Sequence, residues 1–441
     1  MTPAARLAAA IEVLDAIAAS AAPADQTLKA WGKAHRFAGS KDRRVIAERV
    51  YQCLRARALL AWAMGGDDGR ALVLGALAHL DHLPPHEIAA LFSGDLHAPF
   101  PLSFEERARI EATLADPPPE VAAGVPAFIA EALQRTFGAD WIAEAKALVQ
   151  PRAPVDLRVN ALAGSVEGAL KLLAHEGIEA ERSPFSAWGL RLPPEFASDI
   201  QKTRAFTTGW IEVQDEGSQI AAALAGAQPG WTVVDYCAGG GGKTLALAAQ
   251  MRGKRGRLIA CDVNQRRLDA VPERLERARA KAEIRRIGPE GQGTGDLDGQ
   301  ADLVFADAPC SGAGTWRRRP EGAWRVKPED IGRLSELQQA VVARAARLVK
   351  PGGRLVYVTC SILAEENGAV AEAFAAAHPD FRPLPVVEAA RTPDLTDAAR
   401  ARLAELAGPG HTVQLTPRRT DTDGFFIALF ERALFERPPA A

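Results

Sequence analysis

Two hydrophobic periodicities divide the chain. In the range 4–92, apolar residues recur at the spacing of an amphipathic helix, as in Ile46, Val50 and Leu54. From Thr232 onward, short runs rich in valine, isoleucine and leucine alternate with helical patterns. Strands that alternate with helices pair in parallel, so this second pattern predicts a doubly wound α/β sheet. We therefore expect an all-helical unit followed, farther along the chain, by an α/β unit.

Prolines mark the first predicted boundary. The run at 117–119 interrupts the helical pattern and is the best candidate linker. We expect a helical domain over 1–116, a small α+β unit over 120–205 and an α/β domain over 206–436. The predicted strands are 155–160, 178–181, 189–192, 232–236, 257–261, 303–306 and 354–358. The predicted helices after the linker are 126–149, 166–175, 244–251, 264–280 and 331–348.

Composition favours a folded globular protein and argues against disulfide-rich, zinc-binding and membrane-spanning classes. With 47% hydrophobic residues, 24% charged residues and a net charge of −2, the 441-residue chain is typical of folded globular proteins. Its five cysteines include no Cys-x-x-Cys pair, which argues against a disulfide framework or a cysteine zinc site. The N-terminus has no signal-peptide pattern, and no long apolar run could span a bilayer. We expect a cytoplasmic protein with no metal and no membrane partner.

A glycine-rich turn follows the first predicted strand of the α/β domain. It consists of Cys237, Ala238, Gly239, Gly240, Gly241, Gly242, Lys243 and Thr244. At a strand-to-helix junction, backbone amides can approach a ligand closely and the helix N-terminus carries positive potential. The turn therefore predicts a nucleotide-type cofactor.

Three kinds of cofactor site compete for this turn. A Walker A loop needs glycine where Cys237 stands, and a dinucleotide fingerprint needs glycine where Thr244 stands. An S-adenosylmethionine loop tolerates the spacing. About 20 residues later, Asp262 ends the second strand, where an acidic side chain can accept hydrogen bonds from the ribose hydroxyls. The alternative for Asp262 is to cap the next helix.

Two cysteines stand at the ends of further strands. Cys310 follows Asp307, Ala308 and Pro309, and Cys360 lies between a threonine and a serine. Open α/β sheets bind ligands at the carboxyl ends of their strands. A thiol after the proline points to carbon chemistry and away from amine chemistry. The alternative is that Cys310 is a small buried hydrophobe; the other cysteines, Cys53, Cys237 and Cys261, are assigned to packing or backbone contact.

These motifs resemble the Sun (Fmu) family of RNA cytosine-C5 methyltransferases. The similar stretches lie at 158–162, 214–216, 237–244, 307–312 with 314–318 and Pro320, 359–361 and 422–426. The helical N-terminus, at 39–44 and 51–55, is similar to the NusB-type RNA-binding domain of the family's bacterial ribosomal-RNA branch. The resemblance implies a Rossmann-like methyltransferase sheet, S-adenosyl-L-methionine as cofactor and RNA, most of all 16S ribosomal RNA, as substrate.

The resemblance also implies site residues. It makes Cys360 the nucleophile that adds to carbon 6 of cytosine, Cys310 the thiol that helps to resolve the adduct, and Asp307 a hydrogen-bonding partner of the ring. Lys243 or the sulfonium of the cofactor is expected to lower the pKa of a thiol. The residues expected to bind the cofactor are Cys237, Ala238, Gly239, Gly240, Gly241, Gly242, Lys243, Asp262, Arg267 and Asp307.

The chain departs from the family pattern at two points. Gly239 and Gly240 replace the usual alanine and proline. No acidic residue directly follows the third strand, and Glu290 is the candidate substitute for contact with adenine.

RNA contact is expected near the active cysteines. Trp316, Arg317 and Arg318 offer stacking faces and positive charge beside Cys310, although a solvated arginine face is the common alternative. Arg158 and Asn160, in the first similar stretch, complete the predicted RNA-binding set. The expected partner is ribosomal RNA and the expected oligomeric state is a monomer. The alternatives are a tRNA cytosine-C5 methyltransferase and a catalytically silent RNA-binding assembly factor; a nicotinamide-dependent oxidoreductase lacks the full fingerprint.

Overall fold

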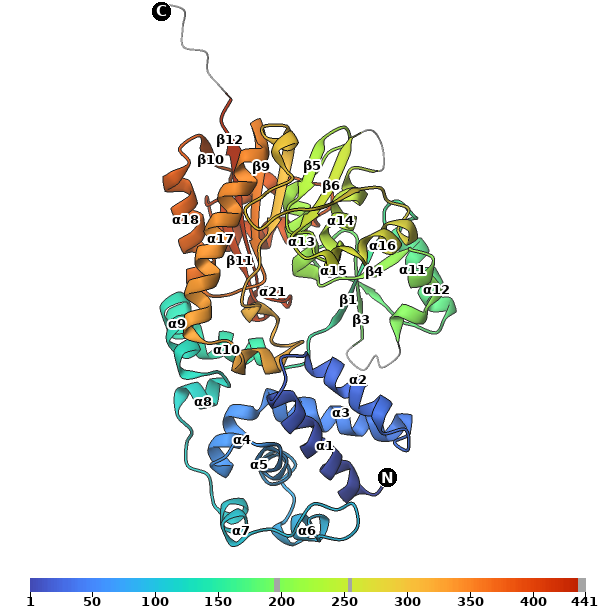
Figure 1. Ribbon diagram of the computed structural model, residues 1–441, viewed down its shortest axis with the longest axis vertical. Coiled ribbons are helices and arrows are strands. Elements are labelled where there is room, and N and C mark those ends of the chain that lie inside the picture. The colour runs from blue at the N-terminus through green and yellow to red at the C-terminus, as the bar shows by residue number, and fades with distance from the viewer. Residues whose placement is uncertain (194–198, 253–255, 435–441) are drawn as a thin grey trace, which may run out of the picture. The chain divides into compact units, whose positions relative to one another are not determined.

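The computed structural model describes residues 1–193, 199–252 and 256–434 (Figure 1). Two compact units make up the chain. The helical unit is Met1–Pro151 with Thr315–Lys327, and the sheet unit is Arg152–Gly314 with Pro328–Ala441. The helices between 119 and 149 thus belong to the first compact unit, whereas the sequence-based domain borders at 116 and 120 stay predictions. Residues 435 and 436, at the end of the predicted third domain, lie outside the described residues.

The described regular elements of the helical unit are helices, as the spacing in 4–92 predicts. They are α1 (Pro3–Ala18), α2 (Ala24–Ala34), α3 (Ser40–Arg55), α4 (Arg57–Met64), α5 (Gly69–Gly75), the π-helical turn η1 (Ala76–Leu80), α6 (Pro85–Leu91), α7 (Phe104–Glu111), α8 (Pro119–Ala123), α9 (Ala127–Phe137), the 3-10 turn η2 (Gly138–Asp140), α10 (Trp141–Val149) and the 3-10 turn η6 (Pro320–Trp324). The hydroxyl of Thr2 caps α1, and Ser103 with Glu106 forms a capping box on α7. Ile46 and Val50 lie in the apolar core, so the periodicity marks the buried face correctly.

The segment Thr315–Lys327, called the strap below, packs within the helical unit although it is far from it in sequence. A carboxylate oxygen of Glu321 accepts a hydrogen bond from the backbone N–H of Ala24, 3.0 Å away at the start of α2. Arg325 Nη2 donates to the carbonyl of Ile17, 2.9 Å away in the last turn of α1. An anion at a helix N-terminus and a cation at a C-terminus both complement the helix dipole. The strap is therefore part of this unit's structure.

A small antiparallel sheet with order β2-β3-β1-β4 forms the first part of the sheet unit. Its elements are β1 (Val155–Val159), α11 (Val166–His175), β2 (Glu181–Arg182), β3 (Gly189–Leu192), η3 (Ile200–Lys202), α12 (Arg204–Thr207) and β4 (Ile211–Val213). The predicted strand at 178–181 is wrong over 178–180. There Gly177 has a φ of +72° and the N–H of Ile178 bonds back to Leu173 of α11, so these residues form the helix end.

The main sheet has the order β10-β12-β9-β8-β5-β6-β7, with β11 paired to β12. Its strands are β5 (Thr232–Asp235), β6 (Arg257–Asp262), β7 (Glu283–Arg286), β8 (Ala301–Asp307), β9 (Val349–Thr359), β10 (Phe381–Pro383), β11 (Thr412–Leu415) and β12 (Phe425–Arg432). The helices and 3-10 turns are α13 (Glu216–Ala225), α14 (Gly242–Gln250), α15 (Gln265–Leu268), α16 (Val271–Arg277), η4 (Gly295–Leu297), η5 (Ala313–Thr315), α17 (Pro328–Leu348), η7 (Ala364–Glu366), α18 (Gly368–Ala377), α19 (Val386–Ala389), α20 (Asp397–Ala407) and α21 (Pro417–Thr420). Strands β5 to β9 are parallel and β12 is antiparallel to β9, which confirms the predicted Rossmann-like α/β class.

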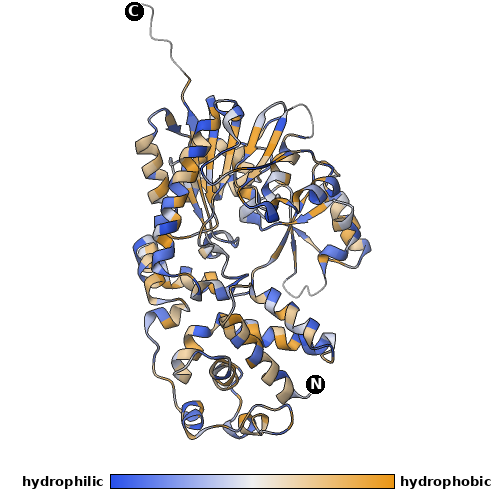
Figure 2. Ribbon diagram, viewed as in Figure 1, coloured by the Kyte–Doolittle hydropathy of each residue, from blue (hydrophilic) through white to orange (hydrophobic). Residues whose placement is uncertain are grey.

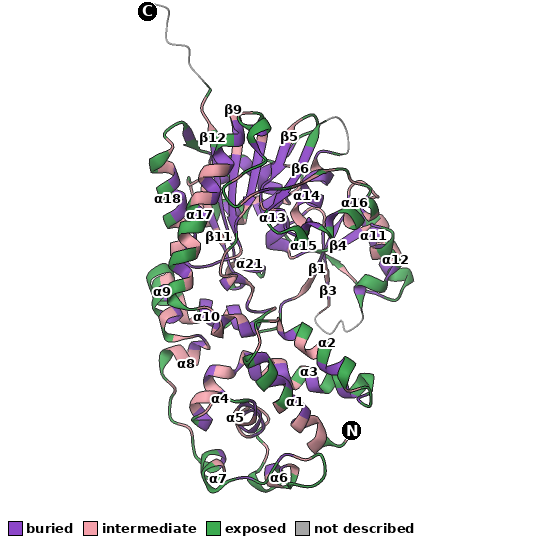
Figure 3. Ribbon diagram, viewed as in Figure 1, coloured by how far each residue is buried: buried purple, intermediate pink, exposed green. Residues whose placement is uncertain are grey.

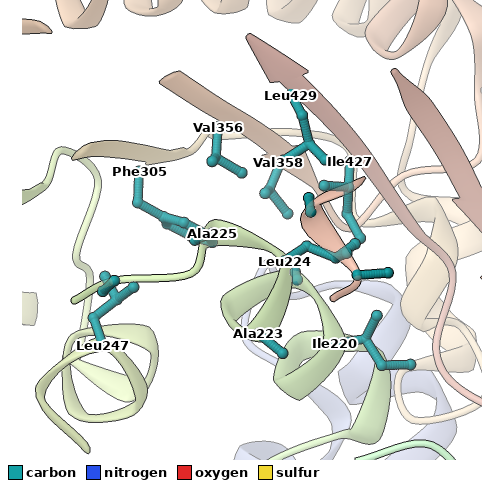
Figure 4. Close-up of a cluster of buried hydrophobic side chains, with 14 of the residues drawn as sticks. Ile220, Ala223, Leu224, Ala225, Leu247, Phe305, Val356, Val358, Ile427 and Leu429 are labelled. Atoms are coloured by element: carbon teal, nitrogen blue, oxygen red, sulfur yellow. The ribbon is translucent and has the colours of Figure 1, made fainter. Parts of the chain in front are cut away.

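Burial on both faces explains why the parallel strands read as continuous apolar runs. Figure 2 shows these strands as the most hydrophobic part of the sheet unit, and Figure 3 shows them buried. Leu224 of α13 and Leu247 of α14 pack on one face against Phe305 of β8 and Val356 of β9 (Figure 4). Among the described residues, no helix is both long and apolar enough to cross a membrane.

The predicted helix at 264–280 is broken into α15 and α16. Pro272 sits in the first turn of α16, where its missing N–H costs nothing, but it could not continue α15.

Candidate active site

The polar groups singled out at strand ends meet at one edge of the main sheet. Asp235, Asp262 and Asp307 are the last residues of β5, β6 and β8, and Cys360 directly follows β9. These four parallel strands are neighbours in the order β9-β8-β5-β6. The chain order reverses between β8 and β5, which makes this edge the topological switch point where open α/β sheets bind ligands.

The glycine-rich turn connects β5 to α14 in a backbone conformation that needs glycine. Gly239 and Gly241 have φ angles of +54° and +81°. A Cβ on Gly239 would lie 2.8 Å from the guanidinium of Arg267, so a side chain there would displace that group. The turn therefore depends on glycine at these two positions, where a side chain would meet both conformational strain and packed neighbours.

Asp262 holds the turn in place. Its Oδ2 accepts from the N–H of Gly239 at 2.8 Å, and its Oδ1 accepts from the N–H of Asn264 at 2.7 Å. It does not cap α15 in the usual way, because Asn264 is the N-cap residue. A carboxylate has about four acceptor positions, so Asp262 keeps capacity for two ligand hydroxyls.

Lys243 and Asp307 form a close ion pair beside the cysteines. Lys243 Nζ lies 2.7 Å from Asp307 Oδ2 and 5.1 Å from the centroid of the Phe425 ring. Burial is the largest single influence and would lower the pKa of Lys243, but the charge and hydrogen bond of Asp307, with smaller contributions from other nearby groups, together outweigh burial and raise it. The Cys360 sulfur contributes to the same rise. Lys243 is thus a fixed positive charge that favours anionic groups around it.

The two predicted catalytic thiols lie side by side. Cys310 Sγ and Cys360 Sγ are 3.4 Å apart, and both residues are half-buried with free thiols. The hydrogen bond with Cys360, followed by burial, raises the pKa of Cys310 well above its ordinary value. The expected lowering of a thiol pKa therefore does not apply to Cys310, which keeps its proton next to the other sulfur.

A close approach of two glycines completes the turn that carries Cys310. The N–H of Gly314 donates to the Cys360 carbonyl at 2.9 Å, and the N–H of Gly424 donates to the Gly314 carbonyl at 2.8 Å. A Cβ on Gly314 would lie 2.0 Å from the Gly424 carbonyl oxygen. The similar stretch at 422–426, near the chain end, thus packs against the active-site turn.

Four of the five predicted RNA-binding side chains are buried, which does not fit direct contact with RNA. Trp316 and Arg317 are 1% and 2% exposed in the strap. Arg158 Nε bonds to Gln214 at 2.6 Å. Asn160 Nδ2 bonds to the carbonyls of Gly209 and Ala278, which joins the small sheet to the end of α16.

Arg158 and Asn160 thus direct polar groups into the fold, where Gln214 and backbone carbonyls accept their hydrogen bonds. The remaining member of the set, Arg318, is half-buried, and its RNA contact stays a prediction.

Four other positions from the sequence analysis, Glu290 and three cysteines, lie outside the pair of adjacent thiols. Glu290 is exposed and pairs with Arg344 of α17. Cys53 and Cys261 are fully buried, and burial raises the pKa of each to about 12. Burial also raises the pKa of Cys237 well above its ordinary value. The described residues include no group of three histidine, cysteine or acidic side chains able to hold a metal ion.

The sequence analysis missed Glu366 and Asn367, which are both buried beside the thiols. Asn367 Nδ2 donates to the Ser361 carbonyl at 3.0 Å, and its Oδ1 accepts from the Thr359 hydroxyl at 2.6 Å. These bonds fix Thr359 and Ser361, the residues directly before and after Cys360. A short acidic turn after a strand carries no sequence signal that separates it from a solvated surface turn.

Comparison with known proteins gives concordant matches. A family model described as 16S rRNA methyltransferase RsmB/F matches residues 221–431. A second model, described as the ferredoxin-like domain of RsmF/B-like methyltransferases, matches residues 125–197. Ribosomal RNA small subunit methyltransferase B of Erwinia tasmaniensis is 33% identical over 303 residues, and that of Yersinia pseudotuberculosis is 34% identical. In both, the match covers 69% of this chain and 65% of the relative, so the chain matches less than two thirds of their length.

Solved structures extend the match in three dimensions. PH0851 aligns over 98% of this chain and 99% of its own, with 26% identity and a TM-score of 0.76. NSun6 from Pyrococcus horikoshii, solved with SFG, aligns over 70% of this chain and 99% of its own, with 19% identity and a TM-score of 0.58. The second likeness supports the fold alone.

Proposed function

Because this chain belongs to the RsmB/F (Sun/Fmu) family, we propose that it methylates carbon 5 of a cytosine in 16S ribosomal RNA, with S-adenosylmethionine as cofactor. The observation that carries the proposal is the pair of thiols at neighbouring strand ends, with their sulfurs 3.4 Å apart. The named substrate of the matched relatives, small-subunit ribosomal RNA, favours that RNA over tRNA. A cytoplasmic, monomeric protein remains the expectation.

The residues at the strand ends fit the proposed cofactor. The turn at Gly239 and Gly241 has the left-handed backbone of a glycine-rich cofactor loop, and Asp262 keeps acceptor capacity for ribose hydroxyls. Arg267, over Gly239, and Lys243 complete the cofactor set together with Cys237 and Asp307. When bound there, S-adenosylmethionine would supply an electrophilic methyl group.

Each catalytic residue has a distinct chemical task. Carbon 5 of cytosine becomes nucleophilic only after a thiolate adds to carbon 6, and this addition is assigned to Cys360. Asp307, held by Lys243, is assigned to the polar edge of the ring near nitrogen 3. After methylation, a base takes the proton of carbon 5, and the electron pair left behind forms the double bond between carbons 5 and 6 and expels the Cys360 thiolate. Cys310 is assigned to this release step because it lies beside the departing sulfur.

The two alternatives predict different outcomes. A silent RNA-binding assembly factor would have no need for the two adjacent thiols or for the ion pair beside them. A tRNA enzyme would share the chemistry and differ only in which RNA is labelled.

The test uses single cysteine variants and labelled S-adenosylmethionine with unmodified 16S ribosomal RNA. Cys360→Ala should abolish methyl transfer and form no covalent complex with RNA. Cys310→Ala should slow turnover by about 100-fold or more and accumulate a covalent protein–RNA adduct that survives denaturing gels. Cys53→Ala, a buried thiol of the helical unit, is the matched control and should keep activity. Full activity of Cys360→Ala would refute the proposed mechanism.

A further inference from the structure

The carboxylate of Glu366 lies buried between the two thiol-bearing turns. Glu366 ends the 3-10 turn η7 and is 0% exposed. Its Oε1 accepts from the N–H of Ser311 at 2.8 Å and from Gln338 Nε2 at 3.0 Å. Its Oε2 accepts from the hydroxyls of Ser311 and Ser361, each 2.5 Å away. Four donors thus fill the four acceptor positions of an ionised carboxylate.

The two serines that donate to Glu366 are neighbours of the predicted catalytic cysteines in the sequence. Ser311 directly follows Cys310, and Ser361 directly follows Cys360. The ladder between β8 and β9 is continued by the bond from Ala308 to Val358, so both thiols lie beyond the paired strands. Past that point, Glu366 joins the two turns through side chains.

We propose that Glu366 is a positioning residue for methyl transfer, which sets the spacing of Cys310 and Cys360 by binding the serine that follows each of them. This inference rests on the proposed function, because it assigns a task to thiols that the proposal makes catalytic. Hydrogen bonds to an ionised carboxylate are about twice as strong as neutral ones, which suits a contact that must hold two loops within a fraction of an ångström.

The surroundings make Glu366 a fixed point. Its backbone carbonyl accepts from the hydroxyl of Tyr357, a fully buried residue of β9, and Gln338 of α17 also bonds to the Pro309 carbonyl at 2.9 Å. Strand β9 therefore holds the backbone of Glu366, and helix α17 holds its carboxylate.

The charge of Glu366 also acts on the thiol of Cys310. Its negative charge is among the causes that raise the pKa of Cys310, after the hydrogen bond with Cys360, burial and the charge of Cys360. Removal of the charge should therefore make Cys310 ionise at lower pH.

The experiment compares Glu366→Gln with Glu372→Gln, which removes a carboxylate from the exposed side of α18. In the full-length protein, Glu366→Gln should lower kcat at least about tenfold and change KM for S-adenosylmethionine less than about twofold. Iodoacetamide labelling of Cys310, followed by peptide mass spectrometry without RNA or cofactor, should shift to lower pH. Glu372→Gln should match wild type in both measurements.

Ser311→Ala and Ser361→Ala keep the inference testable if Glu366→Gln does not fold. Each removes one hydroxyl donor and should lower kcat with KM for the cofactor unchanged. A folded Glu366→Gln with wild-type kcat would overturn the inference, whatever its Cys310 labelling profile. Failure of the proposed function is distinguishable, because wild type would then form no 5-methylcytosine, whereas the labelling profile of Cys310 would still report on Glu366.

Discussion

Asp235 ends β5 in an environment that opposes its charge. It is 0% exposed; its Oδ2 accepts from the Thr244 hydroxyl at 2.6 Å and its Oδ1 has no hydrogen-bond partner. Burial raises the pKa of Asp235 to about 7, with the charges of Asp307 and Asp262 adding to the effect. A folded-state pKa above the unfolded value means that the folded state binds the proton more tightly. The group's contribution to stability is therefore present in acid and is lost as the pH rises to about 7.

Asp235→Asn should remove this pH dependence. Between pH 5 and pH 7, wild type should lose about 2–3 kcal/mol relative to the variant, since each pKa unit corresponds to about 1.4 kcal/mol. Thermal unfolding of both proteins at the two pH values measures the difference. The control is Asp269→Asn, which removes an exposed carboxylate at the C-terminal end of α15. Its stability should change with pH as that of wild type does. An equal difference between wild type and Asp235→Asn at both pH values would contradict the prediction.

At the scale of elements, the contact between the turn after β8 and the turn before β12 leaves no room for added volume. Gly314→Ala would place a methyl group 2.0 Å from the Gly424 carbonyl oxygen, so the two backbones would have to separate. We expect a loss of about 2 kcal/mol or more in unfolding free energy and reduced methyl transfer, because the displaced backbone also bonds to Cys360.

Gly332→Ala supplies the matched change. Gly332 lies in α17 with no atom within 4 Å of its added Cβ, so the substitution should raise stability by about 0.5–1 kcal/mol through helix propensity. Chemical denaturation of the two variants separates steric conflict from the general effect of alanine. Equal stability of both variants would contradict the close approach.

The sequence predicted those parts of the sheet unit that depend on residues close together in the chain. The strands β5, β6, β8 and β9 read as apolar runs because helices cover both faces, and Asp307, Asp262 and Cys360 follow because strand ends are local features. Glu366 was not predicted, because its partner Ser311 is 55 residues away in the chain and no hydrophobic periodicity links the two residues. The burial of Trp316 could not be predicted, because a basic run with an aromatic residue does not disclose which way its side chains face.

At the scale of the whole molecule, the helical unit is assembled from two distant parts of the sequence. The strap supplies Glu321, which bonds to Ala24 from a position 297 residues later in the chain. No pattern confined to a short window can predict such a contact, and this is why the sequence-based domain borders treat 315–327 as part of the α/β domain.

Glu321→Ala should loosen α2 locally. Loss of a side-chain acceptor at a helix start costs about 1 kcal/mol, so amide hydrogen exchange in Ala24–Ala34 should become about five times faster. Exchange in α14 of the sheet unit should stay unchanged, and Glu336→Ala on α17 should affect neither helix. Unchanged exchange in α2 would show that the strap does not stabilise it.

The proposed function depends on the formation of 5-methylcytosine in 16S ribosomal RNA. The most direct measurement is nucleoside mass spectrometry of unmodified 16S ribosomal RNA after incubation with the wild-type protein and isotope-labelled S-adenosylmethionine. The account predicts label in 5-methylcytidine, and none when Cys360→Ala replaces wild type. Label in another nucleoside, or no label in 16S ribosomal RNA from any preparation, would contradict it.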